Sequence, residues 1–250
     1  MFQSYFRKPV KRSLVLDNVQ AVFFDLDGTL VDVDMHLFVP VYLNRLTEQM
    51  KELVEPASAT RAMHRAVAAM FANRDADKTL ETVLFDVLRD ELAMTPEQYR
   101  WCLQEFLHND LEGLRQLVVG HSLSTRLIDA ARARGWQVIL ATNPIFPRDV
   151  VDARVSWGGL DGDKFHHVTA YETEHFCKPH PDFFRENLDL LQLEAERCLM
   201  VGNDTLHDLS ASQVGMQTCL LTPWCIRRPK ERFRADWQGR HEDLLALIEA

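Results

Sequence analysis

Short apolar runs alternate with segments of helical periodicity along most of the chain. Runs at residues 22–24, 136–143, 166–171, 198–202 and 218–221 predict strands, because polar or turn-forming residues follow each of them. Helical spacing predicts a helix through residues 130–135 and further helices over residues 147–154, 181–193, 209–214 and 244–248. This alternation predicts an α/β fold with a Rossmann-like, mostly parallel sheet and helices on both faces.

Residues 32–117 show no clear strand pattern and carry apolar residues at helical spacing instead. Four predicted helices are marked by Leu37, Val41 and Leu46, by Met63, Val67 and Met70, by Leu80, Val83, Leu84, Val87 and Leu88, and by Trp101, Leu103, Phe106 and Leu107. We therefore expect an all-helical domain at residues 32–117, inserted into an α/β domain that comprises residues 1–31 and 118–250.

The composition narrows the partners and the compartment. The 250 residues are 46% hydrophobic, which suffices for one α/β domain with an insert, and a net charge of −9 argues against a nucleic acid partner. The sequence shows no apolar stretch of membrane-span length and no apolar core of a signal peptide, and its five cysteines form no Cys-x-x-Cys pair. We expect a cytoplasmic protein with reduced cysteines and no membrane partner. No pattern indicates an oligomeric state.

The first predicted strand ends in two carboxylates. Asp25 and Asp27 follow residues 22–24, and Gly28 permits a turn after them. Ligands bind at the carboxyl ends of strands in open α/β sheets, so the pair lies where chemistry is expected. One carboxylate could attack phosphorus to form an acyl phosphate, while the other protonates the leaving alcohol and later activates water. Mg²⁺ would offset the repulsion between nucleophile and phosphate. Taken alone, the pair is equally compatible with an ordinary acidic turn.

Three later segments carry polar residues where a phosphate and metal site would need them. Thr142 and Asn143 end the strand at residues 136–143 and could hold phosphate oxygens by hydrogen bonds. Lys178 precedes a proline that can open a helix, which suits a cation facing an anion. The strand at residues 198–202 is followed by Asn203, Asp204 and Asp208.

In this order and spacing, the four segments resemble the haloacid dehalogenase superfamily. Its pattern is Asp-x-Asp-Gly-Thr, a strand-end Ser or Thr, a Lys, and Gly-Asp-x₃₋₄-Asp or a close variant. The resemblance extends from about residue 21 to residue 221. It implies a hydrolase with a Rossmann-like core, in which helices inserted between the first two motifs form a cap of the first class. Such caps close over small substrates, so small phosphorylated metabolites are the expected partners.

The resemblance also implies roles for the first three motifs. Asp25 would be the nucleophile, and Asp27 would be the general acid and base, with its backbone carbonyl on Mg²⁺. Thr142 and the amide of Asn143 would bind the phosphoryl group being transferred. Lys178 would balance the charge of that group and orient the nucleophile.

The fourth motif departs from the usual pattern. Many members of the superfamily have aspartate directly after the glycine, where this chain has Asn203 and then Asp204. The resemblance implies that Asp204 ligates Mg²⁺ together with Asp25 and Asp27, and that Asp208 supports either the residues around the metal or Lys178. Asn203 is an alternative ligand, because an amide carbonyl can also bind Mg²⁺.

The second aspartate separates reaction classes within the superfamily. Dehalogenating members lack an acidic residue at this place, because a halide leaving group needs no proton, so Asp27 favours phosphate ester hydrolysis or phosphoryl transfer. We therefore predict a Mg²⁺-dependent phosphatase that hydrolyses a small phosphorylated metabolite through an aspartyl phosphate. The alternatives are a phosphomutase, in which a hydroxyl replaces water as acceptor, and a non-catalytic binding protein of the same fold.

Several other polar residues are candidates on spacing alone. His175, Cys177 and His180 could hold zinc, but such a site needs a fourth ligand or an open position, and a structural or substrate-facing role ranks ahead. The basic cluster at residues 227–234 is interpreted as solvated surface charge, and His207 is expected at the surface near the mouth of the site. The residues of the predicted insert that could contact substrate are His36, which ranks first, Arg45, His64, Arg65, Arg74 and Trp101.

Overall fold

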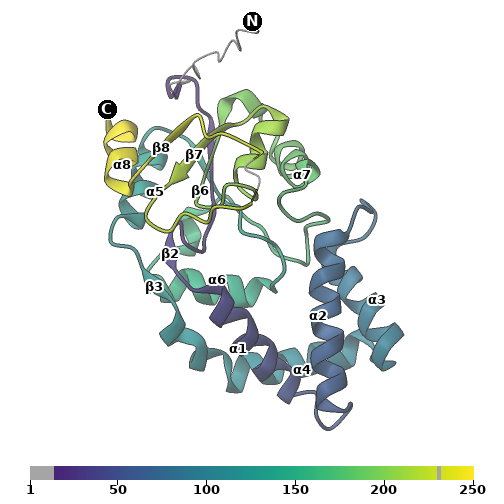
Figure 1. The fold of residues 1–250 in the computed structure, drawn as a ribbon. Coiled ribbons are helices and arrows are strands. Elements are labelled where there is room, and N and C mark those ends of the chain that lie inside the picture. The colour runs from purple at the N-terminus through teal and green to yellow at the C-terminus, as the bar shows by residue number, and fades with distance from the viewer. Residues whose placement is uncertain (1–13, 230–231) are drawn as a thin grey trace, which may run out of the picture.

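Six parallel strands form the main sheet of the fold. The structure is a computed structural model that describes residues 14–229 and 232–250 (Figure 1). Residues 1–13 of the predicted α/β domain, and Lys230 of the basic cluster, lie outside the described residues. The strand order is β5-β4-β1-β6-β7-β8, and every pairing is parallel. The strands are β1 (Ala21–Phe24), β4 (Gln137–Leu140), β5 (His167–Val168), β6 (Cys198–Gly202), β7 (Gln217–Leu221) and β8 (Trp237–Gly239). The predicted Rossmann-like sheet is confirmed, and β8 extends it where the sequence pattern predicts no strand.

Helices make up much of the remaining chain. The α-helices are α1 (Met35–Glu48), α2 (Pro56–Ala72), α3 (Leu80–Leu92), α4 (Pro96–Asn109), α5 (Ser124–Ala133), α6 (Arg148–Trp157), α7 (Pro181–Leu191) and α8 (His241–Glu249). The 3₁₀ helices are η1 (Leu111–Leu117), η2 (Gly162–Lys164), η3 (Ala195–Arg197) and η4 (Leu209–Val214). The segment at residues 209–214 is thus a 3₁₀ helix, α8 begins before the predicted residue 244, and β5 is shorter than the strand predicted over residues 166–171.

Helices cover both faces of the sheet, because alternate residues of β1 join different hydrophobic clusters. Val22 and Phe24 belong to a large cluster that includes side chains of α5, α6 and α8. Ala21 and Phe23 belong to a second cluster with side chains of α7 and η4. Successive side chains of a strand point to opposite faces, so β1 is buried on both. This burial explains its continuous apolar sequence.

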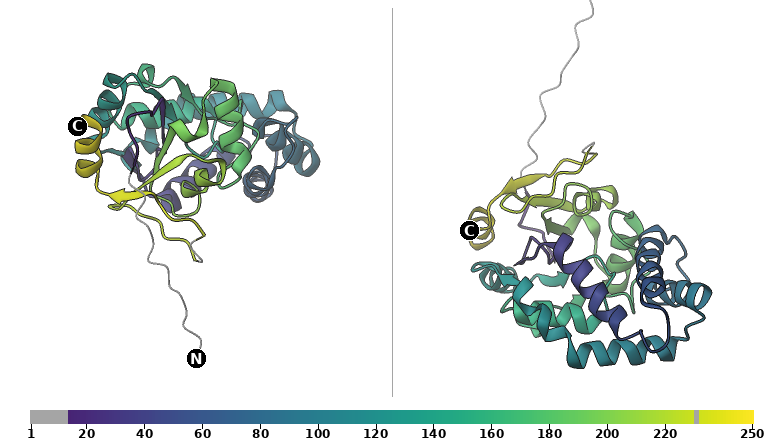
Figure 2. Two further views of the ribbon diagram at one scale, coloured as in Figure 1. Left: turned by 90° about the horizontal axis from the view of Figure 1, so that it is seen from above. Right: turned by 60° about the horizontal axis from the view of Figure 1, so that its bottom comes forward.

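Four α-helices, α1 to α4, and the 3₁₀ helix η1 lie between β2 (Val31–Asp32) and β3 (Val119–Gly120), and the helical spacing predicts the four α-helices. β2 and β3 pair antiparallel where the chain enters and leaves this helical segment. Figure 1 shows α2 and α3 away from the sheet, and Figure 2 shows the same helices from two other directions, on the far side of the molecule from α8. Among the described residues, no helix is both long and apolar enough to cross a membrane.

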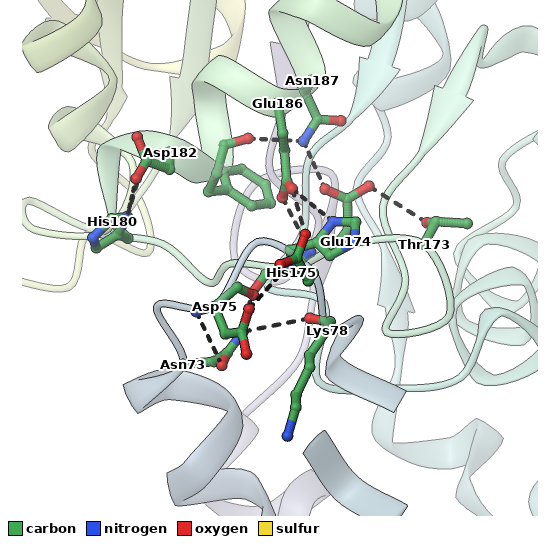
Figure 3. A network of polar contacts seen from close by, with 12 residues as sticks. Asn73, Asp75, Lys78, Thr173, Glu174, His175, His180, Asp182, Glu186 and Asn187 are labelled. Atoms are coloured by element: carbon green, nitrogen blue, oxygen red, sulfur yellow. Dashed lines mark hydrogen bonds and ion pairs between the residues drawn. The ribbon is translucent and has the colours of Figure 1, made fainter. Parts of the chain in front are cut away.

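A polar network ties the loop between α2 and α3 to the loop that precedes α7 (Figure 3). The side-chain amide of Asn73 donates to the carbonyl oxygen of His175 at 2.8 Å, and the Leu80 N–H donates to the Glu174 carbonyl at 2.8 Å. Nδ1 of His175 lies 3.1 Å from Oε2 of Glu186 on α7. Burial, and then the charge of Glu174, raises the pKa of Glu186 to about 9. The helical segment is therefore fixed to the sheet-bearing part at a second place besides the β2–β3 pair.

Candidate active site

The carboxyl ends of β1, β4 and β6 bring the predicted motifs together. These strands are neighbours in the sheet and run parallel, so their ends meet at one edge. Asp25 follows β1, Thr142 comes just after β4, and Asn203 follows β6. Lys178 reaches the same edge from the loop before α7.

Lys178 joins two carboxylates at the centre of the site. Its Nζ lies 2.8 Å from Oδ1 of Asp25 and 2.7 Å from Oδ1 of Asp208, and its side chain is 1% exposed. Burial acts to lower the pKa of Lys178, but the carboxylates of Asp208 and Asp25 raise it above its ordinary value. The ammonium group therefore stays charged and holds Asp25 in place.

Asp25 carries a carboxylate whose charge is only partly compensated. Burial raises the pKa of its carboxyl group to about 7, against the lowering effect of Lys178. Oγ1 of Thr29 donates to its Oδ2 at 3.3 Å, and the Asp25 N–H donates to the Val201 carbonyl at 2.9 Å. A further cation at the site would lower the pKa of Asp25 and keep this carboxylate ionised.

Asp27 is held by an arginine that lies beneath the cavity. Nη1 of Arg154, on α6, lies 2.9 Å from Oδ1 and 2.7 Å from Oδ2 of Asp27. The guanidinium carbon lies 4.5 Å from the ring centroid of Phe146 and 5.5 Å from that of Phe38. The side chain of Arg154 is 0% exposed and that of Asp27 is 12% exposed. Arg154 thus fixes the direction in which Asp27 faces the cavity.

Asp208 organises the loop after β6. Its Oδ2 accepts hydrogen bonds from the backbone N–H groups of Asn203 and Asp204, both at 2.9 Å, while its Oδ1 binds Lys178. A Cβ at Gly202 would lie 2.2 Å from the Asp208 carboxyl group, so only glycine fits beside it. This position makes Asp208 a support for the lysine and for the loop.

The carboxylate of Asp204 is fully hydrogen-bonded. Its Oδ1 accepts from the N–H groups of Leu206 at 2.8 Å and His207 at 3.0 Å. Its Oδ2 lies 2.8 Å from Nε and 2.6 Å from Nη2 of Arg228. Burial acts to raise the pKa of Asp204, but the hydrogen bonds from Arg228 and from the loop amides hold it below its ordinary value.

Thr142 and Asn143 line the cavity just beyond β4. Nδ2 of Asn143 lies 3.4 Å from Nδ1 of His207, and its Oδ1 is buried without a hydrogen-bond partner in the described part of the chain. His207 lies at the cavity, as expected for a residue near the mouth of the site, but its side chain is only 23% exposed and stacks on Phe71 of α2, with ring centroids 6.2 Å apart. Burial lowers the pKa of His207 below its ordinary value.

These side chains surround a cavity of about 280 Å³. Its lining contains every predicted site residue together with His207 and Arg228, and α1 and α2 contribute apolar side chains such as Met35 and Phe71. His36, the first candidate for substrate contact, is exposed and lies outside this lining. The helical segment therefore presents an apolar wall to the polar edge of the sheet.

The polar edge offers the oxygen donors that Mg²⁺ prefers. Asp25, Asp27 and Asp204 bring carboxylates and Asn203 brings an amide to the cavity lining, so the donor types fit a magnesium ion. Among the described residues, however, no group of three or more His, Cys, Asp or Glu side chains is arranged to hold a metal. At Asp204, one candidate ligand, Oδ2 is in contact with Arg228.

A family model of the haloacid dehalogenase-like hydrolases matches residues 19–214. The chain belongs to this family. The match contains all four motifs, so the resemblance that the sequence carries is confirmed, and the protein is a member of a hydrolase family.

Relatives of this hydrolase include phosphate-cleaving enzymes. It is 23% identical over 233 residues to the pyrophosphatase PpaX of Bacillus mycoides, covering 92% of this chain and 97% of that one. Among solved structures, a predicted phosphoglycolate phosphatase from Haemophilus somnus superposes with a TM-score of 0.57 at 19% identity, covering 93% and 99% of the two chains.

Two further solved structures share the fold: one is a dehalogenase, and the other is a hydrolase with magnesium bound. The L-2-haloacid dehalogenase of Xanthobacter autotrophicus superposes with a TM-score of 0.54 at 15% identity, covering 93% of this chain and 99% of that chain. The HAD-hydrolase YfnB of Bacillus subtilis, bound to magnesium, gives a TM-score of 0.54 at 18% identity, with the same coverage. The fold alone therefore does not select between ester hydrolysis and dehalogenation.

His175, Cys177 and His180, whose spacing could suit zinc, each have a different environment in this hydrolase. His175 lies against Glu186, and Nδ1 of His180 accepts a hydrogen bond from the Asp182 N–H at the start of α7. Cys177 is buried, which raises the pKa of its thiol. These contacts account for the three side chains within the loop that carries the family lysine.

Sequence reasoning missed two arginines of the site. The buried residues of α6 are Val150, Val151, Arg154 and Val155, so Arg154 lies on the apolar face of its helix. A charged residue in that register indicates a buried partner, which is a signal available from the sequence. Arg228 gives no such signal, because it lies among other basic residues.

Proposed function

We propose that this hydrolase is a Mg²⁺-dependent phosphatase that cleaves a small phosphate monoester through an aspartyl phosphate on Asp25. We further propose that residues 32–117 form a cap domain over the α/β domain of residues 1–31 and 118–250. The observation that carries the proposal is the buried Lys178, which bridges Asp25 and Asp208 beside the separately held Asp27. The positive charge of Lys178 beside the Asp25 carboxylate reduces the repulsion that this carboxylate would meet when it attacks an anionic phosphoryl group.

In the first step of the proposed mechanism, a carboxylate oxygen of Asp25 forms a bond to phosphorus as the bond between phosphorus and the ester oxygen breaks. The carboxyl group of Asp27 gives its proton to the departing alcohol. In the second step, Asp27 takes a proton from water, whose oxygen attacks the phosphorus of the acyl phosphate. Inorganic phosphate leaves, and the carboxylate of Asp25 is restored.

Several side chains would position the phosphoryl group. Thr142 and the backbone N–H of Asn143 would donate hydrogen bonds to its oxygens, and Lys178 would balance its charge. Asp25, the backbone carbonyl of Asp27 and Asp204 would hold Mg²⁺, with Asn203 as the alternative to Asp204. When bound, Mg²⁺ supplies the positive charge that reduces repulsion between the nucleophile and the phosphate.

Asp27 supports ester hydrolysis over dehalogenation, since a halide leaving group needs no general acid. The names of the relatives, a pyrophosphatase and a predicted phosphoglycolate phosphatase, favour the same chemistry. A cavity of about 280 Å³ with an apolar wall suits a small ester. A phosphomutase would use the same residues, and it differs in yielding an isomeric ester in place of free phosphate.

The test is a panel of small phosphate esters assayed for phosphate release with Mg²⁺ and with EDTA. We expect activity of the wild type with Mg²⁺, and losses of at least about a thousandfold for Asp25→Asn and with EDTA. Matched Asp189→Asn, at an exposed carboxylate on α7, serves as the control and should retain wild-type activity. Equal, near-zero rates for wild type and Asp25→Asn across the panel would contradict the proposed enzyme.

We also propose a cytoplasmic location. The five cysteines form no disulfide, and four of them are buried among apolar side chains. This state suits a reducing compartment.

A further inference from the structure

Arg228 occupies the acceptor sites on Asp204 that a metal ion would need. Each oxygen of a carboxylate has about two lone-pair sites. The N–H groups of Leu206 and His207 use those of Oδ1, and Nε and Nη2 of Arg228 use those of Oδ2. In this arrangement Asp204 has no acceptor site left for Mg²⁺.

The guanidinium group of Arg228 can leave Asp204 while the main chain of Arg228 stays in place. The Ile226 N–H donates to the Asn203 carbonyl at 2.8 Å, and the Thr205 N–H donates to the Ile226 carbonyl at 3.0 Å. The Arg228 N–H donates to Oγ1 of Thr205 at 3.0 Å. The main chain of residues 226–228 is therefore pinned to the loop after β6. The Arg228 side chain is 38% exposed, so water can replace the contacts it gives up.

If the Arg228 guanidinium leaves Asp204 and turns into the cavity, it needs a new anionic partner there. The other carboxylates of the cavity lining are already paired, Asp25 and Asp208 with Lys178 and Asp27 with Arg154. The wall formed by α1 and α2 is apolar, so it offers the guanidinium no counter-charge either. Arg228 itself belongs to the cavity lining. A guanidinium that turns into this space needs an anionic group on the bound molecule, because a charge is costly beside apolar surface without a counter-charge.

We propose that Arg228 is an exchangeable counter-ion, which neutralises Asp204 until Mg²⁺ displaces it and then binds a second anionic group on the substrate. The inference rests on the proposed phosphatase function and deepens it by naming a substrate class. That class is phosphate esters with a carboxylate or a further phosphate. In this proposal, Arg228 is a specificity residue, and it lies in the segment between β7 and β8.

The first arm of the test measures Mg²⁺ binding by titration calorimetry on metal-free protein without substrate. Arg228→Gln should bind Mg²⁺ about five- to tenfold more tightly than wild type, because a competitor for Oδ2 is gone. Arg228→Lys keeps the charge but loses the two-pronged contact, so it should also bind more tightly than wild type. Arg234→Gln makes the same charge change at an exposed residue further along the segment and should stay near wild type. Unchanged or weaker binding by Arg228→Gln overturns the proposal.

The second arm compares KM for a phosphorylated hydroxy acid with KM for the alkyl phosphate of the same length, both at saturating Mg²⁺. Arg228→Gln should raise KM about tenfold for the acid and leave KM for the alkyl ester near wild type. An equal effect on both esters overturns the proposal. A wild type that neither binds Mg²⁺ nor hydrolyses any ester would instead refute the proposed function, so the two failures are distinguishable.

Discussion

Replacing Arg154 by methionine removes one partner of an ion pair at the base of the candidate active site. The substitution keeps an unbranched side chain against the rings of Phe38 and Phe146 but leaves the Asp27 carboxylate without its cation. We expect Arg154→Met to lower the free energy of unfolding substantially.

The magnitude follows from burial. Loss of one partner from a buried ion pair costs about 3–5 kcal/mol. Two features reduce this figure: Asp27 keeps 12% exposure at the cavity, so water can rehydrate it, and Nε and Nη2 of Arg154 are buried without hydrogen-bond partners among the described residues. We therefore expect a loss of about 2–3 kcal/mol.

Urea unfolding at neutral pH in EDTA measures this loss, and a double-mutant cycle assigns it to the pair. Asp27→Asn removes the charge that Arg154 neutralises, so Arg154→Met should cost less in that background, with a coupling energy of about 1–3 kcal/mol. A loss below about 1 kcal/mol for Arg154→Met, or additive single effects in the cycle, would refute the reasoning.

Four further predictions concern pH, the polar network, the leaving group and the metal. The pKa of Glu186 is raised from 4.5 to about 9, so the contribution of this group to stability is fully present below pH 4.5 and is lost as pH rises through 9. The melting temperature of wild type should therefore fall as pH rises from 4.5 to 9, and it should fall less steeply in Glu186→Gln. An equal slope in the two proteins would contradict this prediction. Asn73→Ala should speed hydrogen exchange at the Leu80 and Glu81 amides about fivefold, since it loosens the loop before α3; unchanged rates would show that Asn73 does not hold this loop. Asp27→Asn should lower kcat for alkyl phosphates about 10²–10⁴-fold but much less for para-nitrophenyl phosphate, whose leaving group needs little protonation; equal losses would remove the general-acid role. Added Mg²⁺ should raise the melting temperature of metal-free protein, and a shift retained in Asp204→Asn and Asn203→Ala alike would place the metal elsewhere.

The sequence predicts those parts of the site that depend on local pattern. β1 is a continuous apolar run because both of its faces are buried, and Asp25 follows it directly. Parallel strand ends share one edge, so the three strand-end motifs converge without any further information. Helical periodicity likewise predicts α1 to α4.

The remaining features depend on tertiary placement that local pattern does not encode. Arg154 lies 127 positions from Asp27 in the chain, and Arg228 is one of several neighbouring basic residues. β8 has three residues, which are too few to show strand periodicity. His207 lines the cavity and stacks on Phe71 of α2, which is far from it in the sequence.

The most direct measurement of the central claim is the detection of a phosphoryl group on Asp25. Protein mixed with radiolabelled para-nitrophenyl phosphate and Mg²⁺ is quenched in acid, and the label that stays on the protein is counted before and after hydroxylamine treatment. Asp27→Asn should accumulate more label than wild type, because breakdown of the acyl phosphate needs the general base. We predict hydroxylamine-sensitive label in Asp27→Asn and none in Asp25→Asn. Label that persists in Asp25→Asn, or turnover by Asp27→Asn without any label, would contradict a covalent mechanism at Asp25.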